Sequence, residues 1–134
     1  MRLRKIDFGN ILGASGVQGF FGEGYWFHKP LEPLGLDFAG MTFVSKTATL
    51  EARVGNMPLN PDYTPRDLFP DCIKAKPLKG VMLNSVGLSN PGLGVLLATG
   101  KWQKRVKPFF ISIMSLGDSK EKRLEEFKEI MEIL

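Results

Sequence analysis

Three short apolar runs, almost free of polar residues, constrain the fold of this chain most strongly. They cover residues 11–14, 38–44 and 108–114, and a shorter run covers 81–83. Runs that are apolar throughout are expected where both faces of a sheet are covered, as in parallel sheets. We therefore predict that these segments are buried strands.

Segments between the runs predict helices. Residues 23–34 are expected to form a first crossover helix, although Pro30 and Pro33 interrupt the pattern. Residues 91–99 predict a short helix that begins at a proline and ends before Gly100. The order of strands and helices is that of a parallel α/β sheet.

The last segment gives the clearest helical pattern. Ser119 is expected to cap its start. Apolar residues then recur at helical spacing opposite a face of lysines and glutamates. These apolar positions are Leu124, Phe127, Met131 and Leu134.

Residues 47–79 are rich in proline and asparagine and lack long apolar runs. A connection of this length is uncommon in a compact domain and often serves function. We expect it to cover a site.

The composition limits the function classes. The 134 residues, with 43% hydrophobic and 24% charged side chains, predict a single domain over 1–134. The single cysteine, Cys72, excludes an internal disulfide and predicts a reducing, cytoplasmic setting. No apolar run approaches the roughly 18 to 20 residues that span a bilayer, so no membrane partner is expected.

The net charge of +4 suits an anionic ligand, but the basic residues are scattered and no nucleic-acid partner is expected. The sequence also offers no cluster of His, Cys and carboxylate residues, so no metal site is expected. His28 has no Asp or Cys partner at a readable spacing and is interpreted as structural, and Cys72 is not expected to be a catalytic thiol.

The glycine-rich stretch at Gly13, Gly16 and Gly19 permits two interpretations. Small residues at a strand end let a cofactor approach the backbone, as in NAD(P)-binding Rossmann-type domains. That alternative requires a regular helix directly after the glycines, and residues 20–34 contain two further glycines and two prolines. The other interpretation is the first strand end of a flavin-binding barrel, in which chemistry collects where the parallel strands end.

Four sequence blocks support the second interpretation. These blocks cover residues 10–16, 44–58, 83–92 and 108–113. With these four blocks in this order, the chain resembles the dihydroorotate dehydrogenase family, the FMN-dependent enzymes of pyrimidine synthesis. The resemblance implies an α/β fold, a partial TIM (β/α)8 barrel comprising about its first half, with parallel strands and crossover helices.

The resemblance also implies a cofactor site for FMN. Ala14, Ser15 and Gly16 would pack their backbone near the flavin. Lys46 would lie beside the flavin ring and the substrate carboxylate, flanked by Thr47. A cation there would stabilise negative charge on the reduced flavin.

A pyrimidine substrate is implied in the same way. Asn84 would hydrogen-bond the pyrimidine, and Val86, Gly87 and Leu88 would present backbone amides to its carboxylate. Many relatives have a methionine at the position of Val86. Asn90 is expected to brace the loop rather than touch the substrate.

The implied function is that of the N-terminal part of a dihydroorotate dehydrogenase-like oxidoreductase. No catalytic residue is expected in this chain, because the family's base would lie beyond residue 134. The isolated chain is therefore expected to be inactive and to need either the missing barrel half or a homo-oligomer. The alternative is a non-catalytic half-barrel that serves as a binding or assembly module.

Overall fold

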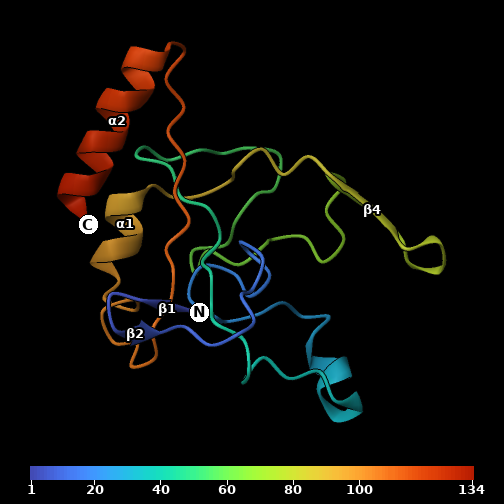
Figure 1. Ribbon diagram of the computed structural model, residues 1–134. Helices are drawn as coiled ribbons and strands as arrows, with labels where there is room; N and C mark the ends of the chain where they lie inside the picture. Colours follow the sequence, from blue (N-terminus) through green and yellow to red (C-terminus); the bar gives the residue numbers. More distant parts are fainter.

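The computed structural model describes residues 1–134, apart from the side chain of Pro77. Two small antiparallel sheets form its regular β-structure: β1 (Arg2–Leu3) pairs with β2 (Ile6–Asp7), and β3 (Ile73–Lys76) pairs with β4 (Val81–Asn84). Figure 1 shows the β3–β4 hairpin projecting on the side of the molecule opposite to the two α-helices.

The expected partial TIM (β/α)8 barrel is wrong. The named strands of the described chain pair only in the antiparallel sense, and no crossover helix joins parallel strands. Residues 81–83 do lie in a strand, β4, but it belongs to the exposed hairpin. The apolar runs at 11–14, 38–44 and 108–114 form no continuous strands.

These three runs nevertheless meet through isolated bridges of parallel sense. Leu12 bridges Thr42 on one side, while Val44 bridges Phe110 and Ala48 bridges Ile113 on the other. The segment from 42 to 48 therefore lies between the other two. What is absent is a continuous ladder between the bridges.

Serine side chains and a bulge interrupt that ladder. Ala48 lies four positions after Val44, whereas Ile113 lies only three positions after Phe110, so the register shifts by one residue between these bridges. The amide of Ser112 donates to the Ser45 hydroxyl at 2.9 Å instead of to a backbone carbonyl. A one-residue insertion of this kind bends a strand and redirects a side chain.

The helices agree with the sequence in part. Helix α1 (Leu93–Ala98) confirms the short helix expected at 91–99. The expected first crossover helix is reduced to the 3-10 helix η1 (Lys29–Leu34), because Pro30 and Pro33 cannot donate backbone hydrogen bonds. A second 3-10 helix, η2 (Pro77–Lys79), forms the tip of the hairpin.

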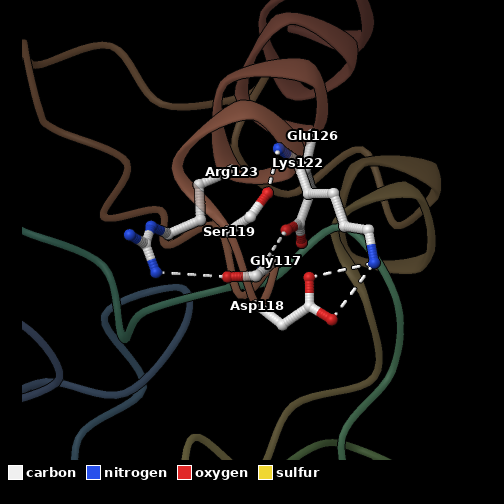
Figure 2. Close-up of polar contacts among 6 residues, drawn as sticks. All are labelled: Gly117, Asp118, Ser119, Lys122, Arg123 and Glu126. Atoms are coloured by element: carbon white, nitrogen blue, oxygen red, sulfur yellow. Dashed lines mark hydrogen bonds and ion pairs between the residues drawn. The ribbon is translucent and has the colours of Figure 1, made fainter.

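Helix α2 (Lys120–Ile133) begins as expected at Ser119, whose hydroxyl accepts from the Lys122 amide at 3.2 Å. Figure 2 shows the contacts that secure this end: Lys122 pairs with Asp118 at 2.9 Å, and the Glu126 carboxylate accepts from the Gly117 amide at 3.0 Å. The preceding turn is thus tied to the second turn of α2.

The core draws on segments from the whole chain. Its buried cluster consists of Phe20, Ala48, Leu93, Leu96, Trp102 and Ile130. The indole of Trp102 donates to the Phe20 carbonyl at 2.7 Å, which ties the glycine-rich stretch to the segment after α1.

Only Ile130 of α2 reaches this core. The apolar positions expected to face it are exposed instead, with Leu124 at 53%, Phe127 at 43% and Met131 at 53% of their maximal area. The burial of α2 therefore rests on one side chain.

We predict that Ile130→Ala lowers the free energy of unfolding by about 2–5 kcal/mol, because Ile130 is fully buried and the surrounding core cannot close the cavity completely. Met131→Ala is the matched control, since Met131 is 53% exposed, and its loss should stay below about 1 kcal/mol. Urea denaturation followed by circular dichroism measures both. Equal losses would contradict the single-anchor packing of α2.

Candidate functional site

Lys46 lies in the bulge, where its backbone contacts the glycine-rich stretch. Its amide donates to the Gly19 carbonyl at 2.8 Å. Gly16, with φ of +80°, lies so close that an added Cβ would be 3.4 Å from Lys46 Cγ. The Tyr25 hydroxyl donates to the Gly16 carbonyl at 2.7 Å and fixes this turn. The small residues thus make room for the lysine that the bulge redirects.

The Lys46 ammonium is largely removed from water. It donates to the Ser89 carbonyl and lies 4.7 Å from the centre of the Phe20 ring. Burial lowers the pKa of Lys46 to about 8. The ion pairs of the described residues do not include Lys46, so it is a half-buried cation without a carboxylate partner.

A row of hydroxyl groups runs beside Lys46 and crosses the three central segments. Ser15 Oγ donates to the Ser45 carbonyl at 3.0 Å and lies 2.9 Å from Thr47 Oγ1. Thr47 Oγ1 lies 2.9 Å from Ser112 Oγ. Ser15, Gly16, Lys46 and Thr47 therefore lie close together, and their role in binding FMN stays a prediction. Ala14 is exposed and belongs to this group only as the residue that precedes Ser15 in the sequence.

The loop at 85–89 has a distinctive arrangement of its backbone. Its carbonyl groups are bonded to protein: the Ser85 carbonyl accepts from Asn56 Nδ2 at 2.7 Å, and the Gly87 carbonyl accepts from Arg53 Nε at 3.2 Å. The Val86 carbonyl accepts from the Asn56 amide at 2.9 Å.

Three consecutive backbone amides of the same loop form no hydrogen bond with the described residues of the protein. Within the part of the chain that the structure describes, the N–H groups of Val86, Gly87 and Leu88 donate to no protein atom. Gly87 and Leu88 both have a positive φ, at 71° and 58°. Successive amides in turn conformations of this kind form sites for anions. The loop ends at Ser89, whose carbonyl accepts a hydrogen bond from the Lys46 ammonium, so the cation contacts the residue that directly follows these amides.

Residues 53–57 brace this loop from behind. Arg53 and Asn90 exchange both backbone hydrogen bonds, at 2.8 and 2.9 Å. Gly55 is in close contact with the loop, since an added Cβ would lie 2.3 Å from Ser89 Oγ and 2.6 Å from the Val86 carbonyl. Residues 53–57 and the 85–89 loop are therefore closely packed, and the carbonyls of Ser85, Val86 and Gly87 face Arg53 and Asn56.

Asn90 braces the loop, as expected from the sequence. It is 2% exposed, and its Nδ2 donates to the Leu88 carbonyl at 2.7 Å and to Thr49 Oγ1 at 2.9 Å. Its Oδ1 accepts from the Gly92 amide at 2.9 Å. All of these bonds are internal to the protein.

Asn84 is not brought to the same place by any contact of the described residues. It ends β4, opposite Ile73, and its side chain is exposed. Asn84, predicted from the sequence to bind the pyrimidine, is therefore separated from Ser15, Lys46 and Thr47 by the length of the 85–89 loop.

Sequence reasoning missed Arg53, Asn56 and Gly55 as the residues that orient the loop. The signal for them was the length of the 47–79 connection, which was expected to cover a site. The same connection lines a largely apolar hollow of about 390 Å³. Its lining residues are Ala52, Arg53, Val54, Pro58, Leu59, Asn60, Tyr63, Asn90 and Pro91.

The remaining expectations concern dinucleotides, metals and membranes. Residues 15–21 form turns, so the glycines are not followed by the helix N-terminus that a pyrophosphate needs. The described residues contain no group of three or more His, Cys, Asp or Glu side chains that could hold a metal ion. Among them, no helix is both long and apolar enough to cross a bilayer.

His28 is buried, and its Nδ1 accepts from the Tyr25 amide at 3.2 Å. Burial lowers the pKa of His28, which favours the neutral ring in this contact. These features suit the structural role expected for His28.

No protein-family model, curated protein or solved structure was found to match the chain.

We predict that Gly55→Ala disrupts the 85–89 loop far more than Gly80→Ala. Both glycines have a positive φ, at 57° and 61°, but nothing lies within 4 Å of a Cβ added at Gly80. The two variants thus share the conformational strain and differ in the clash, which should cost an extra 1–3 kcal/mol or so. Urea denaturation and the amide NMR shifts of Val86 to Leu88 test this. Equal losses, with unmoved amide shifts in both variants, would contradict the close contact at Gly55.

The pH dependence of stability should reveal the desolvated lysine. The pKa of Lys46 falls from its ordinary 10.5 to about 8 on folding, so the unfolded chain binds more protons between these values. The free energy of unfolding should therefore gain a stabilising contribution from Lys46 as the pH rises from about 8 to 10.5. Lys46→Met should remove that contribution. A denaturation series across this pH range measures it, and an unchanged slope in the variant would contradict the burial of the ammonium.

Proposed function

We propose that this chain supplies the substrate-binding and flavin-facing surface of an FMN-dependent oxidoreductase that converts dihydroorotate to orotate. The observation that supports the proposal is that two groups able to bind an anion are connected through one loop. The amides of Val86, Gly87 and Leu88 are unused, and the loop they belong to leads directly to a desolvated Lys46 ammonium. A carboxylate held there would gain charge-assisted hydrogen bonds that neither group satisfies within the protein.

The proposed role of Lys46 in binding an anion follows from its loss of hydration. Lys46 has lost much of its hydration, as its lowered pKa reflects, and has gained a carbonyl oxygen and the face of the Phe20 ring in return, but no anionic partner among the described residues. An anion beside it restores a favourable electrostatic partner in a setting where water screens poorly. Because the pKa remains near 8, the lysine is mostly cationic at neutral pH.

The residues also fit the polar edge of a flavin. The hydroxyls of Ser15, Thr47 and Ser112 form a continuous row through the residue after Lys46, and Gly16 next to Lys46 has no side chain. Bound FMN would supply the hydride acceptor for the oxidation. The named residues account for the ring edge and not for the phosphate group.

The role of Lys46 in this proposal is to remain cationic while it orients the substrate and stabilises negative charge. It is therefore unsuited to remove the substrate proton, and that step is assigned to none of the site residues named above. The proposal rests on the arrangement at Lys46 and the 85–89 loop and does not depend on a barrel.

A second candidate is a non-catalytic module that binds a small carboxylate. The same observation supports it, since Lys46 and the loop amides bind an anion whether or not a flavin lies beside them. The two candidates differ in flavin binding, which is directly measurable.

We predict that the chain binds orotate and that Lys46→Gln weakens this binding at least about tenfold, the usual effect of losing a hydrogen bond to a charged group. Lys101→Gln is the matched control, because Lys101 also lies over an aromatic ring, at 4.6 Å from the centre of Phe21, but is exposed. Wild-type affinity should fall as the pH rises through about 8, where Lys46 loses its proton. Isothermal titration calorimetry measures all three effects.

Titration of the chain with FMN, followed by its absorption band and fluorescence, separates the candidates. Orotate binding together with FMN binding supports the oxidoreductase. Orotate binding without FMN binding supports the non-catalytic module. If orotate does not bind, or Lys46→Gln binds it as wild type does, the proposed function is overturned.

A further inference from the structure

The β3–β4 hairpin has a surface that the proposed function does not use. Its register places Lys74 opposite Leu83 and Lys76 opposite Val81. Directly opposed residues of an antiparallel pair share a face, so lysines and apolar side chains alternate on one side of the hairpin. Figure 1 shows that the hairpin extends away from the rest of the molecule, with its tip at the outermost point.

The apolar side chains at and near this tip are exposed to water. Leu78 in η2 is as exposed as in an extended chain, at 105% of its reference area, and Val81, which adjoins the tip, is 50% exposed. Met82 and Leu83, further along β4, are 65% and 70% exposed. A single exposed apolar residue is ordinary, but several on one projecting hairpin indicate a site of interaction.

The charge on the hairpin has one sign. Residues 73–84 contain Lys74, Lys76 and Lys79 and no acidic residue. Lys74 pairs with Asp71 at the base of the hairpin, at 3.0 Å. The ion pairs of the described residues leave Lys76 and Lys79, which flank Leu78, without a carboxylate.

We propose that the hairpin tip adsorbs onto an anionic lipid surface. Leu78 would enter the interface between headgroups and acyl chains, and Lys76 and Lys79 would contact the acidic headgroups. An apolar tip between basic side chains matches the two contributions to interfacial binding, apolar burial and attraction to anionic lipid.

The pattern favours lipid over two other occupants. Lysines along a strand edge oppose pairing with a second copy of the same basic hairpin. A polyanion such as nucleic acid would use the lysines but leave Leu78 exposed. Adsorption at a surface is distinct from crossing a bilayer, for which the described residues form no helix that is long and apolar enough. It does not depend on the proposed function.

The test is sedimentation of the full chain with vesicles. One set contains phosphatidylcholine alone, and the other contains phosphatidylcholine and phosphatidylserine in equal amounts. We expect binding to the second set that high salt weakens. Each lysine near an anionic surface contributes about fivefold in affinity, so Lys76→Gln with Lys79→Gln should lower binding by at least about tenfold.

The control has the same change in charge far from the tip. Lys120→Gln with Lys128→Gln removes two exposed lysines from α2, on the opposite side of the molecule, and should retain most of the binding. Leu78→Ser should weaken binding to acidic vesicles while leaving its salt dependence in place. Leu78→Trp should show a blue-shifted emission when those vesicles are added.

Several outcomes would overturn the proposal. These are a lack of binding to acidic vesicles, equal binding to both vesicle sets, and equal losses in the hairpin and α2 variants. Sedimentation velocity without lipid covers the remaining alternative: a dimer that Leu78→Ser dissociates would assign the tip to a second copy of the chain.

Discussion

The hydrogen bonding of residues 42–48 to neighbours on both sides is the constraint on which the structure depends. One side bonds to the glycine-rich stretch and the other to residues 110–114. Ala48, fully buried, carries this segment into the core. Because the register shifts by one residue between the bridges, Lys46 extends beneath Ser89 and over Phe20. The position of the ammonium is thus a consequence of the backbone pairing around it.

The candidate site combines two features that arise independently. The cation is desolvated by packing, and the amides of Val86, Gly87 and Leu88 donate to no protein atom of the described chain, while residues 53–57 bond the carbonyls of the same loop. Each feature alone is common in proteins. Ser89 connects the two features, because its carbonyl accepts from Lys46 and it directly follows the three free amides. Both features favour an anion, and this is the physical basis of the proposed carboxylate substrate.

Features that depend on near neighbours could be predicted from the sequence. The cap at Ser119, helix α1 and the bracing role of Asn90 were all recognisable from short patterns. The parallel strands were wrongly predicted, because an apolar run does not reveal where its amides donate. Here the Ser112 amide donates to the Ser45 hydroxyl, and the ladder is interrupted until Ala48. Similarly, β4 has the apolar residues of a buried strand but lies in an exposed hairpin.

The sequence by itself determined the local chemistry: which turns need glycine, where proline limits a helix, where a lysine without an adjacent acid occurs, and how charge is distributed along the hairpin. Only the tertiary structure decided that Lys46 loses its water, that the amides of Val86 to Leu88 have no acceptor and that Leu78 is uncovered. The reason is that solvation and hydrogen-bond satisfaction depend on atoms brought from distant parts of the chain. A residue's own neighbours in sequence do not specify those atoms.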